Sequence, residues 1–212
     1  MKEKLISKAV LGKENNLILP EGFLRRNHLL EDQEWWINQR DGSVILLPRV
    51  PDLRKLYIEP TTLCNLKCHT CIRNIWKNKG GHMGMETFHT LMEQIGEFPQ
   101  LDRVVFVGFG EPFMHPHILE MIGLVHQRNL DVTIISNGQL LDNSILREIV
   151  QLGVDRLVVS LDGVTPETYA GVRGASLAKV LDNIRSLNEI KSELGSLFPA
   201  LGIAFVALES NI

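Results

Sequence analysis

Residues 51–212 alternate short, β-branched apolar runs with amphipathic segments, and this alternation most constrains the fold. The expected strands are 55–59, 103–107, 132–136, 156–160 and 201–206, and the expected helices are 85–97, 116–127, 142–152 and 176–194. Each expected strand is almost continuously hydrophobic, as a strand covered on both faces should be. The sequence therefore predicts a parallel sheet with helical crossovers, either a (β/α) barrel or a doubly wound sheet.

The expected strands end in polar or glycine residues, namely Glu59, Gly108, Ser136 and Ser160. In parallel α/β folds the ligand lies at the carboxyl-terminal edge of the sheet. A closed barrel of eight units usually needs about 250 residues, which is more than this segment provides. We therefore expect a partial (β/α) barrel that stops after its fifth strand, as in a truncated chain or fragment.

Residues 1–50 differ in texture and predict a small β-rich module. The boundary lies at Pro48-Arg49-Val50-Pro51, because closely spaced prolines favour an extended linker. Short strands are expected at 17–20 and in a hairpin over 35–47 that turns at Asp41-Gly42, with a helical turn or two over 21–29.

Composition excludes several classes of protein. The 212 residues carry 22 Lys and Arg against 25 Asp and Glu, so a protein that mainly coats nucleic acid or an anionic membrane is not expected. No apolar run reaches the roughly 18 residues of a membrane span, and the start lacks a signal peptide. The 3 cysteines cannot form an even disulfide framework and indicate a reducing compartment or a metal site. We expect a soluble, cytoplasmic protein.

All three cysteines follow the first expected strand, as Cys64, Cys68 and Cys71. Three thiolates without a fourth cysteine suit a 4Fe-4S cluster that leaves one iron open to a substrate. Two alternatives stay open. The spacing also suits three small core residues on one helix face, and a structural zinc ion could take His69 or His82 as its fourth ligand.

Three further motifs follow later strands: Gly108-Phe109-Gly110-Glu111-Pro112, Ser136-Asn137-Gly138, and Ser160-Leu161-Asp162-Gly163 with Val172-Arg173-Gly174 downstream. The first fails as a dinucleotide-binding fingerprint, because Phe113 occupies the third glycine position and no helix is expected to open there. Each motif alone is typical of a turn. Their shared placement at successive strand ends favours a common ligand.

The cysteine motif and these strand-end motifs resemble, in order, those of the radical S-adenosylmethionine (radical SAM) superfamily. Phe109 replaces one glycine of the family's GGEP motif, and Thr70 replaces the usual aromatic residue before the last cysteine. The resemblance implies that an exposed acidic side chain and neighbouring backbone accept bonds from the SAM amino group, and that an arginine pairs with the SAM carboxylate. The implied cluster ligands are Cys64, Cys68 and Cys71, and the implied SAM-binding residues are Gly108, Gly110, Glu111, Ser136, Asn137, Ser160 and Arg173.

The resemblance also implies the reaction. The reduced cluster would cleave SAM to methionine and a 5′-deoxyadenosyl radical, which abstracts hydrogen from a substrate, with the protein supplying placement and shielding. The string from Thr61 to Arg73 looks most like the cofactor-modifying proteins of tungsten-dependent aldehyde oxidoreductases. Peptide-modifying maturases share the same motif series, so the expected substrate is a cofactor or a peptide.

Several partners follow as expectations. The basic stretch Arg73, Trp76, Lys77 and Lys79 is either a mobile solvated loop or a functional segment. The functional interpretation is a lid, or a docking surface for an anionic substrate or for an acidic electron donor such as a flavodoxin or ferredoxin. The amino-terminal module is similar to AbrB/MazE-type hairpins, which predicts a homodimer or a substrate-peptide platform. A strand-rich extension that packs on the barrel is the alternative. A non-catalytic zinc module and a DNA-binding regulator acting through the hairpin are the alternative functions.

Overall fold

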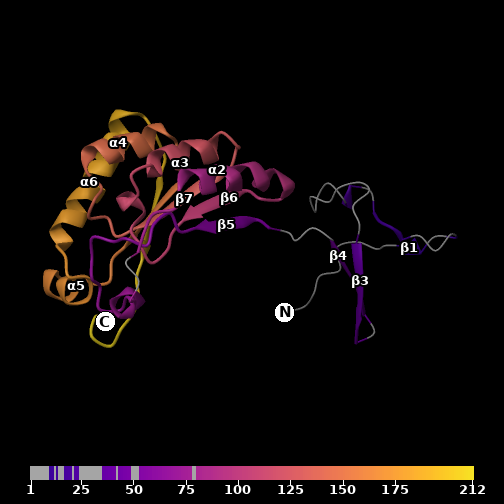
Figure 1. Cartoon of the computed structure of the whole chain (residues 1–212), viewed down its shortest axis with the longest axis horizontal. Coiled ribbons are helices and arrows are strands. Elements are labelled where there is room, and N and C mark those ends of the chain that lie inside the picture. Colours follow the sequence, from indigo (N-terminus) through magenta and orange to yellow (C-terminus); the bar gives the residue numbers. More distant parts are fainter. Residues whose placement is uncertain are drawn as a thin grey trace. The chain divides into compact units, whose positions relative to one another are not determined.

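The computed structural model describes residues 10–11, 13, 17–20, 22–23, 35–41, 43–48, 53–77 and 80–212. The chain divides into two compact units, residues 1–52 and residues 53–212. Both units are drawn in Figure 1, and each is described by itself.

The smaller unit contains two antiparallel strand pairs. Strands β1 (Val10–Leu11) and β2 (Leu17–Ile18) pair with each other, and β3 (Trp35–Arg40) forms a hairpin with β4 (Ser43–Pro48). Arg40 lies opposite Ser43, so the hairpin turns over two residues, and Asp41 has the positive φ of 50° that such a tight turn favours. The hairpin confirms the prediction, whereas most of the expected helix over 21–29 lies outside the described residues.

The larger unit is built on a five-stranded parallel sheet with the strand order β5-β6-β7-β8-β9. Its strands are β5 (Lys55–Ile58), β6 (Arg103–Phe106), β7 (Asp131–Ser136), β8 (Arg156–Ser160) and β9 (Ala200–Ala204). All four neighbouring pairs run parallel. The predicted parallel α/β architecture is therefore confirmed, with strand ends displaced by at most a few residues.

Helices connect successive strands, and Figure 1 shows α2, α3, α4 and α6 gathered along one side of the sheet. The helices are α2 (Met85–Gln94), α3 (Ile118–His126), α4 (Asn143–Gln151), α5 (Pro166–Arg173) and α6 (Leu177–Glu193), with 3₁₀ turns η1 (Ile72–Ile75), η2 (Ile95–Glu97) and η3 (Pro112–Met114). Four of the helices match the predicted segments. The fifth, α5, was not predicted.

The core lies between the sheet and its covering helices. Alternate strand residues face the helices, and Val104, Phe106, Val132, Ile134 and Val159 are each fully buried there. Phe106 lies opposite Ile134, and Ile134 lies opposite Leu157. This register brings the loops after β5, β6, β7 and β8 out at one edge of the sheet, where the predicted site residues are found.

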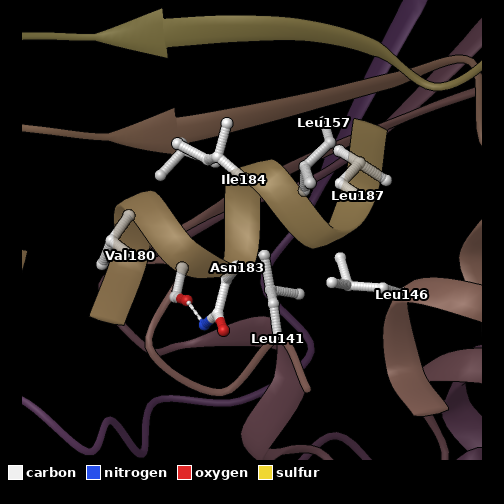
Figure 2. Close-up of a pocket in the computed structure, with 9 residues that line it drawn as sticks. Leu141, Leu146, Leu157, Val180, Asn183, Ile184 and Leu187 are labelled. Atoms are coloured by element: carbon white, nitrogen blue, oxygen red, sulfur yellow. Dashed lines mark hydrogen bonds between the residues drawn. The ribbon is translucent and has the colours of Figure 1, made fainter. Parts of the chain in front are cut away.

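A pocket in the larger unit lies between α6, α4 and the sheet and reaches Gly138 in the loop after β7 (Figure 2). Leucine, isoleucine and valine side chains line it, and it has no room for a water molecule. Asn183 donates a hydrogen bond of 2.7 Å to the carbonyl of Gly138 at its border. The pocket is a packing seam that ties α6 to the loop after β7.

Among the described residues, every helix is too short or too polar to cross a lipid bilayer.

Candidate active site

The cysteine loop leaves β5 and is fastened at its base by a short antiparallel contact. Thr61 bridges to His82, and the Thr62 N–H donates to the Gly81 carbonyl at 3.0 Å. The Gly81 N–H in turn donates to the Thr62 hydroxyl at 2.8 Å. These contacts explain why two threonines precede the first cysteine, because their hydroxyls form hydrogen bonds with backbone groups of this loop.

The three cysteines are free thiols on this loop, each half-buried. The Leu66 N–H points to the Cys64 sulfur at 3.4 Å, and the Cys71 N–H donates to the Cys68 carbonyl at 3.0 Å. The loop is irregular between 64 and 71, so the alternative of three core residues on one helix face is wrong.

Among the residues that the structure describes, no three His, Cys, Asp or Glu side chains converge closely enough to hold one metal ion. Two thiolates on one tetrahedral zinc ion would stand about 3.8 Å apart, given a Zn–S bond near 2.3 Å. Cysteines that bind different irons of one cluster do not have to meet at a point. Three free thiols on one loop are therefore compatible with a 4Fe-4S cluster.

Burial raises the pKa of the Cys68 thiol above 9.0, and the Arg173 guanidinium opposes this effect. The Arg173 Nη1 lies 3.8 Å from the Cys68 sulfur. The charge and the N–H donor both favour a thiolate, which is the form that binds metal.

The glycine-rich loop after β6 packs tightly against the cysteine loop. A Cβ on Gly110 would lie 1.8 Å from the Thr61 carbonyl oxygen, so no other residue fits there. The Glu59 carboxylate accepts hydrogen bonds from the N–H groups of Phe109 and Gly110, at 2.5 and 3.2 Å. Phe109, which replaces a glycine of the family motif, places its ring edge-on to Trp76 with 5.0 Å between centroids.

Glu111 differs from the expectation of an exposed acidic acceptor. It is only 2% exposed, and its carboxylate accepts hydrogen bonds from the Ser136 hydroxyl, the Asn137 N–H and the Phe113 N–H at 2.8, 2.8 and 3.3 Å. Burial raises the pKa of Glu111, and these bonds only partly offset that effect. The carboxylate therefore joins the loops after β6 and β7 from within the protein.

The loop after β7 reaches the cysteine loop through Asn137. Its side-chain amide donates to the Asn65 side-chain oxygen at 2.8 Å and lies 3.7 Å from the Cys64 sulfur. The Ser136 hydroxyl, by contrast, donates to Glu111 and accepts from the Gly138 N–H at 3.0 Å. Ser136 thus shapes this turn from a buried position, and its contact with SAM stays a prediction.

Arg173 is the last residue of α5 and contacts the cysteine loop at Cys68. Its Nε lies 2.7 Å from Asp162 Oδ2, an ion pair in which the N–H is not aligned as a hydrogen bond. The His69 N–H donates to the Val172 carbonyl at 2.7 Å and fastens the cysteine loop to this helix end. Ser160, at the end of β8, is half-buried, and its hydroxyl forms no hydrogen bond within the described part of the chain.

The structure adds residues that the sequence analysis missed. The most important are Glu59, Asn65, Gln139 and Asp162, which contact the predicted residues Gly110, Asn137 and Arg173. Asp162 stood within a recognised motif but was not assigned a role. Thr165, Pro166 and Thr168 form a capping box with proline at the helix start, a sequence signal from which α5 could have been predicted.

Comparison with known proteins identifies the arrangement. The family model described as the radical SAM superfamily matches residues 58–202, which includes the cysteine loop and the three later strand-end motifs. The chain belongs to the radical SAM superfamily.

Curated relatives extend this result. The chain is 32% identical over 160 residues to the tungsten-containing aldehyde ferredoxin oxidoreductase cofactor-modifying protein of Pyrococcus furiosus, covering 75% of this chain and 45% of that protein. It is 28% identical to the probable GTP 3′,8-cyclase of Methanocaldococcus jannaschii, covering 76% and 52%. It is 31% identical to the PqqA peptide cyclase of Gluconobacter oxydans, covering 63% and 37%. The chain therefore spans about half of these proteins or less.

Solved structures agree with the fold. Streptococcus suis SuiB bound to the precursor peptide SuiA aligns with a TM-score of 0.57 at 20% identity, over 65% of this chain and 31% of that one. The enzyme anSMEcpe with bound AdoMet and a peptide aligns with a TM-score of 0.57 at 21% identity, over 72% and 42%. At this level of identity the likeness supports the α/β fold alone.

Proposed function

We propose that this chain is the SAM-cleaving core of a radical SAM maturation enzyme that acts on a cofactor or a peptide. One observation carries the proposal. The loops after β5, β6 and β7, together with the end of α5, meet around three free thiols and are joined to one another by hydrogen bonds. Family membership supplies the class of chemistry, SAM-dependent radical formation.

The proposed role of each residue follows from the polar groups or backbone that it has available for a ligand. Cys64, Cys68 and Cys71 would hold a 4Fe-4S cluster, which when bound supplies the electron that cleaves SAM to a 5′-deoxyadenosyl radical. Gly108 is exposed and Gly110 is half-buried, so a ligand can approach this backbone closely on the face that Glu59 and the cysteine loop leave open.

Two further groups are available to polar groups of SAM. They are the Ser160 hydroxyl, which has no hydrogen-bond partner among the described residues, and the Arg173 Nη2. Glu111 and Ser136 stay behind this surface and hold Asn137 in place.

Anaerobic reconstitution with iron and sulfide, followed by SAM and dithionite, tests the proposal. We expect a brown protein that releases 5′-deoxyadenosine. The matched control is the triple variant Cys64→Ser, Cys68→Ser, Cys71→Ser, which should bind no cluster. If the wild-type chain took up zinc in preference to iron, or if the triple variant became equally brown, the proposal would be wrong.

The electron donor is a second part of the proposal. Lys77 is exposed and Arg73 is half-buried beside the cysteine loop, while Lys79 lies outside the described residues. A flavodoxin or ferredoxin with an acidic surface would dock there by charge complementarity. Reversing the charges with Arg73→Glu and Lys77→Glu should slow reduction by such a protein and leave reduction by dithionite unchanged. Equal slowing with both reductants would contradict the docking role.

The substrate class rests on the relatives. One is named for modifying a tungsten-enzyme cofactor and another for cyclising a peptide, so a cofactor precursor or a peptide is the proposed class. We also propose that residues 1–52 form a homodimer or a peptide platform, because a lone two-stranded hairpin is marginally stable by itself. Sedimentation equilibrium of the chain with and without residues 1–52 tests the dimer, and two monomeric species would exclude it.

A further inference from the structure

Asp162 and Arg173 form a partly buried ion pair beside the cysteine loop. Asp162 is 1% exposed, and the Arg173 side chain is 14% exposed. The other arginine–carboxylate pairs among the described residues, Arg103–Asp131, Arg147–Glu193 and Arg185–Asp182, have side chains at least 34% exposed. A surface pair contributes little to stability, whereas a buried pair costs desolvation and calls for an explanation.

The position of Asp162 is fixed by its surroundings. Its Oδ1 accepts a hydrogen bond of 2.9 Å from the Val206 N–H, and its carbonyl accepts one of 2.9 Å from the Asn211 side chain. Gly163 follows, and a Cβ there would lie 2.3 Å from the Tyr169 backbone nitrogen. The loop after β8 is therefore packed directly against α5, the helix that carries Arg173.

This arrangement fixes the direction of the Arg173 guanidinium. Its Nε faces Asp162 at 2.7 Å, and because the guanidinium is planar and rigid, holding one nitrogen sets the direction of the others. Its Nη1 lies 3.8 Å from the Cys68 sulfur. The carboxylate thus acts on a proposed cluster ligand through the arginine.

We propose that Asp162 is a positioning residue that holds the Arg173 guanidinium against the Cys68 sulfur and thereby raises the reduction potential of a cluster bound there. The inference rests on the proposed function, because it requires a cluster on Cys68. Reduction adds one electron to the cluster. A fixed positive charge and an N–H donor at a ligating sulfur stabilise the reduced state more than the oxidised state.

The variant Asp162→Asn tests the inference with little change of shape. Asparagine can still accept from the Val206 N–H, but it places an amide NH₂ opposite the Arg173 Nε. We expect a full cluster content and a midpoint potential shifted to more negative values, measured by EPR-monitored titration without SAM. Loss of the Asp162 charge alone would shift the potential to more positive values, so a negative shift reports displacement of the guanidinium. Arg173→Gln should shift the potential the same way, and the double variant should add little, since both changes remove one interaction.

The apoprotein gives a readout that needs no cluster. The Arg173 Nε is buried beside Asp162, so its hydrogen exchange, followed by NMR, should be slow in the wild type. It should be faster in Asp162→Asn, where the ion pair no longer holds the side chain in this buried position. The matched control is Asp182→Asn, which removes a carboxylate from an exposed arginine pair on α6. It should change neither the potential nor the Arg173 exchange.

The outcomes separate the two proposals. If wild-type protein binds no iron and sulfide, the proposed function fails. If it binds a cluster whose potential is unchanged in Asp162→Asn, the positioning role fails while the proposed function stands. Should Asp162→Asn not fold, Arg173→Gln decides the question, because it leaves the Asp162 contact with Val206 intact, and an unshifted potential there overturns the inference.

Discussion

At the scale of single residues, Gly110 allows two loops to pack closely because it has no side chain. In Gly110→Ala the new Cβ would overlap the Thr61 carbonyl oxygen and crowd that of Leu63, and both are backbone atoms of the cysteine loop. We expect unfolding free energy to fall by about 3 kcal/mol, measured by urea denaturation of the apoprotein. The control is Gly123→Ala in α3, where the new methyl would meet only Leu152 at an ordinary 3.9 Å. A similar loss in both variants would contradict the close-packing explanation.

Glu111 predicts a pH dependence at the same scale. Burial raises its folded-state pKa above the ordinary 4.5, so the folded protein keeps a proton that the unfolded chain has released. Stability from this group is therefore fully present below the unfolded pKa and is lost as pH rises through the folded pKa.

The variant Glu111→Gln has no titrating group at this position. Its side-chain NH₂ would face a backbone N–H donor, which lowers the unfolding free energy by about 1–3 kcal/mol. We expect the difference in unfolding free energy between wild type and this variant to shrink as pH rises above 4.5. Chemical denaturation at several pH values measures this difference. Thr165→Ala is the control, because it removes a hydrogen bond to the Thr168 N–H and no contact of Glu111, so its stability gap should change little with pH. A Glu111→Gln gap independent of pH would contradict the raised pKa.

At the scale of elements, the sequence predicted what depends on local pattern. Apolar runs and helical periodicity placed all five strands and four of the helices, because those patterns reflect burial against a sheet. Polar residues such as Asn137 and Arg173 were placed at the correct edge. What Glu111 and Ser136 contact could not be predicted, since burial at a strand end depends on loops from two other strands.

Helix α5 carries the element-scale prediction. Thr165 caps it and shares a capping box with Thr168, and Gly174 ends it in the left-handed conformation with φ of 66°. Thr165→Ala should destabilise the protein by about 1 kcal/mol and speed amide exchange within α5. The control is Thr90→Ala in α2, whose hydroxyl only donates to the Glu86 carbonyl. Equal exchange in α5 for both variants would show that the cap does not hold this helix.

At the scale of the whole molecule, the described core of the larger unit is formed by residues of that unit. Every described residue of that core, including those packed at its margin, lies between Leu53 and Ile190. A unit of this size buries about 70% of the surface that its unfolded chain exposes, which is enough for independent folding.

We therefore expect a chain of residues 53–212 to unfold cooperatively at the temperature of the full chain's main transition and to take up the same amount of iron and sulfide. Calorimetry and metal analysis measure these two quantities. A chain of residues 53–195 is the control, because it lacks β9, which pairs with β8, and the Val206 and Asn211 contacts to Asp162. It should lose both properties. If residues 53–212 also failed to bind a cluster, the amino-terminal unit would have to contribute to the site itself.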